Sequence, residues 1–416
     1  MNQYSMTSSQ RNFLFGAMGI GVICMILTWM IDDELHTRFW SNLLLNSTFF
    51  TLISVMALFF MAASITAYAG WYVTFKRIIE AFSLFMVVGL VLLIIIGLGN
   101  YFHWHHLYHW TDTADVATDQ VLLGKSSFLN ANWYMFGTII FGGAWAYLAY
   151  KIRDLSVSED DDGADVDRTF KYHNKIRVYA AILLPLIGFA SAAMIWQWIM
   201  SVDAHWYSTM FAWYTSASAF VAMLALAILL VIFLKSRGYF ELVNENHIHD
   251  LGKYLFAFSI FWTYLWFSQF MLIWYANIGE ETIYFKERYN NYATLFFANI
   301  AINFLVPFII LMRNDTKRKV GTMTFVAIVV LLGHWLDFFL MIKPGTLITA
   351  NHAMGVETEA VQGFVSGFTV PSLLDLGTFI GFLGLFVYVS LWIMSKAALT
   401  PKNDPYLEES VHHHVV

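Results

Sequence analysis

Long apolar runs alternate with short polar segments along almost the whole chain. A helix needs about 20 apolar residues to cross a hydrocarbon core about 30 Å thick, and ten of the runs reach that length. We expect them at residues 12–31, 44–69, 81–102, 132–150, 178–201, 207–234, 253–277, 293–312, 320–341 and 373–395. The pattern predicts an all-α polytopic membrane protein with ten transmembrane helices.

Composition supports this class. Of the 416 residues, 59% are hydrophobic and 12% are charged, whereas soluble domains hold about 45–50% apolar and about 25% charged residues. With six prolines and no strong linker, residues 1–416 are expected to form a single membrane domain. The only cysteine, Cys24, allows no intrachain disulfide. A single cysteine also cannot supply the roughly four thiolates that an iron–sulfur cluster uses. Nothing in the sequence indicates nucleic-acid binding.

The distribution of Lys and Arg predicts the orientation. Of the 23 such residues, 18 fall in the segments that share a side with the N-terminus. The other side holds Arg38, Lys125, Lys286, Arg288 and Lys343. Because basic residues concentrate in cytoplasmic loops, both termini are expected in the cytoplasm. The acidic run 157-VSEDDDGADVD-167 is then expected to be a solvated cytoplasmic loop.

The order of the spans suggests an internal arrangement. The second to fifth spans (about 44–201) and the sixth to ninth (about 207–341) each form a set of four with the same direction of crossing. We therefore expect two parallel four-helix bundles, flanked by the first and last spans. Aromatic and ionisable residues gather in the predicted external loops.

Two His–Asp pairs are candidates for proton transfer or a quinol pocket. His334 and Asp337 lie three residues apart, on one face of the ninth span. Asp203 and His205 lie in 200-MSVDAHWYSTMFAWYTSASAF-220, at the expected outer end of the fifth span. A histidine near a carboxylate changes its protonation near neutral pH. The alternatives are a structural contact between helices for the first pair and an aromatic turn for the second.

Further polar groups follow the seventh and eighth spans. Glu280 and Glu281 end the seventh span and join the proton-transfer or quinol-pocket candidates. A polar stripe precedes them and is expected to face protein or water, either as a proton path or as hydrogen-bonded contacts between helices. The stripe comprises Tyr264, Ser268, Gln269 and Tyr275. Asn299 and Asn303 in the eighth span have the same two interpretations.

The loop 100-NYFHWHHLYHW-110 contains four histidines: His103, His105, His106 and His109. The alternatives are a haem or zinc site and interfacial histidines among aromatic residues; the second is favoured, so no metal ligands are expected. At the start of the third span, Glu80 and Arg77 are candidates for cytoplasmic proton entry. Interfacial anchoring is the alternative for them.

Three motifs carry a family resemblance: 201-SVDAHWYSTMFAWY-214, 267-FSQFMLIWYANIGEET-282 and 333-GHWLDFFLMIKP-344. On a ten-span frame they resemble the NrfD/PsrC-like membrane subunits of bacterial alternative complex III. The modest length is most similar to the smaller of the two ten-span subunits of that complex.

The resemblance implies a place in a quinol:cytochrome c (or cupredoxin) oxidoreductase of a bacterial inner membrane. It implies a sister NrfD-like subunit, an iron–sulfur subunit, haem c subunits and a terminal oxidase as partners. Haem c and the iron–sulfur clusters would belong to those partners, and this chain would hold no cofactor beyond a quinone (menaquinone or ubiquinone) and lipids. The family's quinol pocket lies at the periplasmic end of a bundle. The alternatives are a purely structural scaffold subunit and a stand-alone ion or solute transporter.

Overall fold

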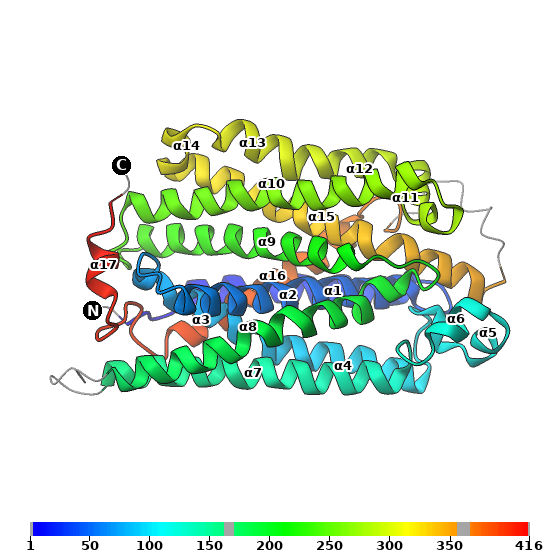
Figure 1. The fold of residues 1–416 in the computed structure, drawn as a ribbon, viewed down its shortest axis with the longest axis horizontal. Coiled ribbons are helices and arrows are strands. Elements are labelled where there is room, and N and C mark those ends of the chain that lie inside the picture. The colour runs from blue at the N-terminus through cyan, green and yellow to red at the C-terminus, as the bar shows by residue number, and fades with distance from the viewer. Residues whose placement is uncertain (1–2, 162–169, 356–366, 415–416) are drawn as a thin grey trace.

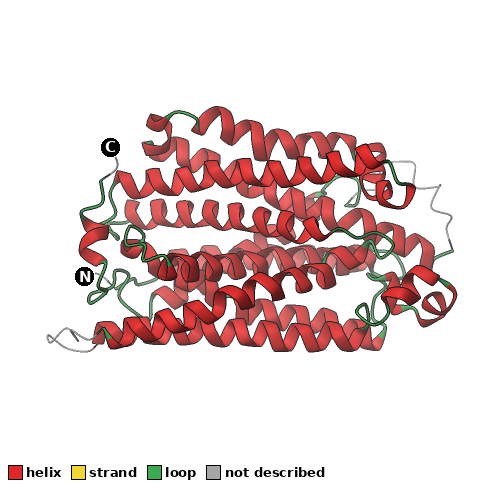
Figure 2. Ribbon diagram, viewed as in Figure 1, coloured by secondary structure: helices red, strands yellow, loops and turns green. Residues whose placement is uncertain are grey.

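The computed structural model describes residues 3–161, 170–355 and 367–414, and every regular element in these ranges is helical (Figure 2). Residues 162–167 of the predicted acidic loop lie outside these ranges. The first half contains α1 (Ser8–Ile31), α2 (Thr37–Thr66), α3 (Lys76–Leu84), α4 (Met86–Phe102), α5 (Thr113–Thr118), α6 (Gln120–Lys125), α7 (Ala131–Asp161) and α8 (Lys171–Trp198). The second contains α9 (Thr209–Ser236), α10 (Glu245–Ala276), α11 (Gly279–Asn291), α12 (Ala293–Ile300), the π-helix η4 (Ala301–Leu305), α13 (Val306–Leu311), α14 (Asn314–Arg318), α15 (Val320–Ala353), α16 (Leu373–Met394) and α17 (Leu407–Val411).

Nine helical segments within the described residues are long and apolar enough to cross a membrane. The chain is therefore an all-α, multi-pass membrane protein, as its sequence predicts. The remaining expected span, residues 132–150, corresponds to α7, whose 31 residues extend over about 46 Å. Its apolar residues are interrupted by Asn132, Gly142 and Gly143, and its crossing of the membrane stays a prediction.

The long helices run side by side, and both ends of the described chain lie at the same end of the molecule (Figure 1). We call this the terminal end; it also carries α14 and α17. The opposite, distal end carries α5, α6 and α11. The C-terminal segment crosses the terminal end, where His247 Nε2 lies 3.0 Å from the Ser410 carbonyl oxygen and His413 Nε2 lies 2.6 Å from Asp250.

Three helices form the centre of the molecule. α2, α9 and α15 contact one another, and 78–83% of the most apolar stretch of each is buried. Helices that are apolar on all sides belong in such an interior. α3, α4, α7 and α8 pack around α2, whereas α10, α12 and α13 pack with α9 and α15. α1 pairs mainly with α16 at the periphery.

One predicted boundary is wrong. The ninth span was expected to end near residue 341, before Pro344, but α15 continues to Ala353. Proline removes the backbone hydrogen bond to the carbonyl four residues earlier, which here belongs to Leu340. Arg288 Nε donates to that carbonyl oxygen at 2.9 Å. A side chain from α11 therefore replaces the missing backbone donor, and the helix continues.

Close packing of glycines joins α1 to α16. A Cβ atom at Gly381 would lie 2.4 Å from the Gly21 Cα atom, so neither position has room for a side chain. Small residues allow helix backbones to approach closely in membranes. We expect Gly381→Leu to destabilise the protein by about 1–3 kcal/mol, the range for overpacking. Thermal unfolding in detergent measures this, and Gly19→Leu is the control because no atom lies within 4 Å of a Cβ there. Equal melting temperatures for the two variants would contradict the prediction.

Candidate functional site

Asp337 lies at the centre of a buried polar cluster that we call the Asp337 cluster, comprising Tyr214, Ser218, Trp262, Asn299, Asn303, His334 and Asp337. Four donors surround its carboxylate. Oδ1 accepts from the Tyr214 hydroxyl and from Asn299 Nδ2 at 2.7 Å. Oδ2 accepts from Ser218 Oγ at 2.7 Å and from Trp262 Nε1 at 2.9 Å. The donors come from α9, α10 and α12. Together with α15, which carries Asp337, the carboxylate therefore connects four helices.

His334 joins the cluster through a serine. Its Nδ1 atom lies 2.9 Å from Ser218 Oγ, and the same hydroxyl donates to Asp337. Since a hydroxyl has one hydrogen, His334 must donate from Nδ1 when Ser218 donates to the carboxylate. The other ring nitrogen, Nε2, is buried and has no hydrogen-bond partner in the described protein. The ring therefore offers a free acceptor at one side of the cluster.

The order of the cluster residues along α15 and α9 shows that the cluster extends along the helix axes. On α15, which runs from the terminal to the distal end, His334 precedes Asp337. On α9, which runs the opposite way, Tyr214 precedes Ser218. His334, Ser218, Asp337 and Tyr214 thus follow one another from the terminal toward the distal side. A proton moving along this line would travel parallel to the helices.

Asn299 lies near the end of α12, and Asn303 lies in the π-helix η4 that follows it. Asn303 Nδ2 donates to Asn299 Oδ1 at 2.7 Å, which fixes the Asn299 amide with its NH₂ group toward Asp337. The space is tight, because a Cβ at Gly333 would lie 2.2 Å from Asn303 Oδ1. Single π turns within α-helices occur frequently at functional sites. The two asparagines predicted from their spacing therefore lie in the Asp337 cluster.

The structure separates candidates that the sequence grouped together. His334 and Asp337 lie near the middle of α15 rather than at an outer helix end, because this helix continues past Pro344. Asp203 and His205 instead lie in the segment between α8 and α9. Glu280 is exposed, and the carbonyl of Glu281, not its carboxylate, accepts from Trp206 Nε1 at 3.1 Å.

Asp203 forms a buried ion pair that sequence reasoning missed. Its Oδ2 atom lies 2.9 Å from Arg288 Nη2, and the Arg288 side chain is 3% exposed. The guanidinium also lies over the Tyr284 ring, 3.3 Å from its centroid. Burial raises the pKa of Tyr284, which stays a neutral phenol. Asp203 thus helps to hold α11 to the segment between α8 and α9.

His205 lies in a separate, more exposed group at the distal end. Its Nε2 atom is 2.6 Å from Asp119 Oδ2, and this contact lowers the Asp119 pKa to about 2. His109 lies beside it, with ring centroids 5.3 Å apart, and burial lowers the His109 pKa. A cavity of about 230 Å³ opens between these histidines, Asp203 and Tyr284. In the same loop, His105 is buried and burial lowers its pKa to about 4.

The predicted polar stripe is divided between surface and interior. Tyr264 and Tyr275 are 61% and 84% exposed on this chain, whereas Gln269 is buried and Ser268 is intermediate. A separate apolar groove of about 370 Å³ lies between α2, α8, α9 and α10. Trp213, Ser216 and Ala217 line it from the face of α9 that is turned away from Asp337. α9 therefore separates the groove from the Asp337 cluster.

Glu80 and Arg77, the predicted proton-entry residues, lie in a buried ion cluster near the terminal end. Glu80 accepts from Arg77 at 3.0 Å, from Arg153 at 2.5 Å and from Ser156 Oγ at 2.7 Å. Arg77 also pairs with Asp160 at 2.6 Å. Next to them, Lys76 pairs with Asp404 of the C-terminal segment.

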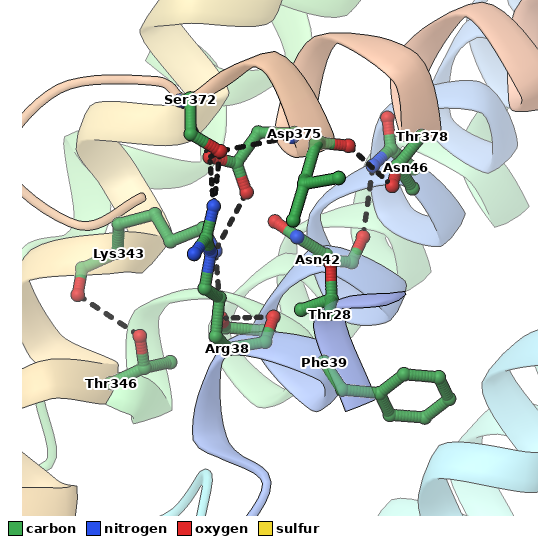
Figure 3. Close-up of polar contacts among 12 residues, drawn as sticks. Thr28, Arg38, Phe39, Asn42, Asn46, Lys343, Thr346, Ser372, Asp375 and Thr378 are labelled. Carbon is green, nitrogen blue, oxygen red and sulfur yellow. Dashed lines mark hydrogen bonds and ion pairs between the residues drawn. The ribbon is translucent and has the colours of Figure 1, made fainter. Parts of the chain in front are cut away.

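A second ion cluster, near the distal end, joins α2, α15 and α16 around Asp375 (Figure 3). Arg38 lies 3.5 Å and Lys343 3.8 Å from its carboxylate oxygens. Lys343 is fully buried and donates to Ser41 Oγ at 2.8 Å, while Arg38 contacts Ser372. The sequence showed these two cations only as loop charges at the ends of spans, without a partner.

The sequence contained part of the signal for the missed residues. Lys343 and Arg288 were both among the five basic residues on the sparsely charged side, and a rare charge beside an apolar run indicates a buried partner. Tyr214, Ser218 and Trp262 gave no such signal, because they resemble ordinary residues of an apolar helix. No model of a known protein family matches the chain, and no curated protein is similar to it in sequence.

Proposed function

We propose that the chain is a proton-conducting membrane subunit of a quinol:cytochrome c (or cupredoxin) oxidoreductase, of the NrfD/PsrC-like kind found in bacterial alternative complex III. The observation that carries the proposal is the buried line from His334 through Ser218 to Asp337 and Tyr214. Buried ionisable groups within membrane spans are costly and are typical of proton relays. Two of the three sequence motifs that suggested the family contribute to this line or to the Arg288–Asp203 pair beside it: residues 201–214 supply Asp203 and Tyr214, and residues 333–344 supply His334 and Asp337.

The chemistry of the line suits proton transfer. A proton that binds His334 Nε2 allows Nδ1 to pass its proton to Ser218 Oγ, while the Ser218 hydroxyl proton passes to Asp337. Of the four groups that donate to this carboxylate, only the two hydroxyls can rotate from donor to acceptor; Trp262 N–H cannot, and Asn303 fixes the Asn299 amide. Both hydroxyls lie on the line, one on each side of Asp337. Quinol oxidation releases two protons, which such groups can accept and pass on.

The rest of the proposal follows the resemblance and the distribution of charge. Ten spans, including α7, would form two parallel four-helix bundles flanked by α1 and α16, with the terminal end in the cytoplasm of a bacterium. A quinone (menaquinone or ubiquinone) would approach the distal half, with its tail or a lipid chain in the apolar groove. Electrons would continue through iron–sulfur clusters and haem c in partner subunits, beside a sister NrfD-like subunit and a terminal oxidase.

Single substitutions in the purified complex test the relay. Positioned acid–base groups contribute about 10²–10⁴-fold to a rate. We therefore expect Asp337→Asn and Ser218→Ala each to lower quinol:cytochrome c turnover and proton release in vesicles by at least about a hundredfold. Ser236→Ala is the matched control, because Ser236 lies in the same helix, is exposed, and belongs neither to the Asp337 cluster nor to the apolar groove.

The outcomes separate the proposal from its alternatives. If the complex assembles and both rates are unchanged in Asp337→Asn and Ser218→Ala, the relay is wrong and the chain acts as a scaffold. If the chain isolates alone, without haem c or iron–sulfur proteins, and moves an ion or solute in vesicles, it is a transporter. Co-purification of those partners with a loss of rate confined to the two relay variants supports the proposal.

A further inference from the structure

Three metal-binding side chains converge at the distal end from distant parts of the chain. His109 follows α4, Asp115 lies in α5 and His352 lies in the last turn of α15. Each offers one ligand atom, and the three atoms all lie within 4.8 Å of one another. The imidazole rings of His109 and His352 are 4.5 Å apart between centroids. More than two hundred residues separate these histidines in sequence, so only the fold brings them together.

The separations from Asp115 bracket the spacing between two ligands of a tetrahedral metal ion. Ligand atoms at about 2.0–2.2 Å from Zn²⁺ lie about 3.4 Å from each other in a tetrahedron. Here His109 Nε2 and His352 Nδ1 lie 2.9 and 3.6 Å from Asp115 Oδ2. A contact of 3.6 Å is too long for a hydrogen bond, so hydrogen bonding alone does not explain the position of His352. The three groups leave a position between them that a cation can occupy.

Exposure and charge also favour a cation. The His109 side chain is 15% exposed, that of Asp115 31% and that of His352 53%, so an ion can enter and a water molecule can complete the coordination. Asp112 and Asp119 flank Asp115 in the same segment and make it acidic. The cavity of about 230 Å³ borders both histidines.

We propose that His109, Asp115 and His352 form a binding site for a divalent transition metal, for which Zn²⁺ is the best match. Two imidazoles, one carboxylate and a water molecule are a common zinc environment. The metal fastens the segment between α4 and α7 to the end of α15, across the mouth of the distal cavity. The site is independent of the function proposed above.

Zn²⁺ binding to the full-length protein in detergent tests the site. After removal of metals with a chelator, the affinity is measured by competition with a fluorescent zinc indicator. Mutation of residues that hydrogen-bond to metal ligands, without binding the metal themselves, already lowers metal affinity by about 10–100-fold. We therefore expect His109→Gln, His352→Gln and Asp115→Asn each to weaken binding by at least about tenfold. His106→Gln, in the same loop, should bind as the wild type does.

The C-terminal histidines require a separate control, because His412 and His414 could also bind zinc at the terminal end. A variant with both changed to alanine should keep the distal affinity. Loss of binding in this variant, with unchanged binding in His109→Gln and His352→Gln, overturns the proposal. Co²⁺ provides a second readout: its visible d–d absorption should show a four-coordinate site in the wild type and lose intensity in His352→Gln. Equal melting temperatures without metal establish that the variants are folded.

Discussion

Arg288→Ala is expected to lower the free energy of unfolding by about 3–5 kcal/mol, the usual effect of removing one partner from a buried ion pair. The guanidinium is almost fully buried and pairs with Asp203 at 2.9 Å. It also donates to the carbonyl oxygens of Leu340 and Met341 at 2.9 and 3.2 Å. Its loss would leave one carboxylate uncompensated and remove the side-chain donor that serves α15 at Pro344.

The measurement is a denaturant titration of the purified protein in mixed micelles. Lys286→Ala is the matched control, since Lys286 is exposed in the same helix, and its effect should stay within about 0.5 kcal/mol. Adding Asp203→Ala to Arg288→Ala should recover part of the loss, because it removes the uncompensated charge. A loss below about 1 kcal/mol in Arg288→Ala would show that neither contact contributes as argued.

Glu80→Ala should destabilise the terminal half by a similar amount, about 3–5 kcal/mol. Glu80 lies between Arg77 and Arg153, with side chains that are 0% and 7% exposed. Without the carboxylate these two cations would face each other in a buried site. Asp160 would remain, but it forms an ion pair with Arg77, at 2.6 Å, and not with Arg153.

Chemical denaturation of Glu80→Ala and of a surface control checks this expectation. Lys151 and Asp154 form an exposed pair at 3.8 Å, with side chains 34% and 45% exposed. Asp154→Ala should therefore cost less than about 1 kcal/mol. Replacing Arg153 in the Glu80→Ala background should restore stability by removing one of the two cations. If the double variant is less stable than Glu80→Ala, repulsion between the guanidinium groups is not the cause.

Both predictions concern ion clusters that join elements distant in sequence. The Asp337 cluster likewise joins helices that are distant in sequence. Its carboxylate accepts from residues on three other helices, so its position depends on the packing of α9, α10, α12 and α15. The spacing of His334 and Asp337 correctly indicated a shared helix face. The serine that connects them belongs to α9, and nothing in its local sequence distinguishes it from its neighbours.

The hydrophobic pattern by itself determined that this is an all-α, multi-pass membrane protein, and each of the nine helical segments able to cross a membrane in the described residues overlaps one of the expected spans. It could do so because burial of an apolar run in lipid depends on the length and composition of that run alone. The same reasoning failed at Pro344, since the missing backbone donor is supplied by Arg288 from another helix.

The tertiary structure decided which polar groups meet. It placed Asp203 with Arg288 rather than with His205, and it brought His352 to His109. The physical reason is that a buried polar group is stabilised only by a partner at hydrogen-bonding distance. Such distances depend on how whole helices pack, so the sequence identified the ionisable residues, and the fold determined their partners.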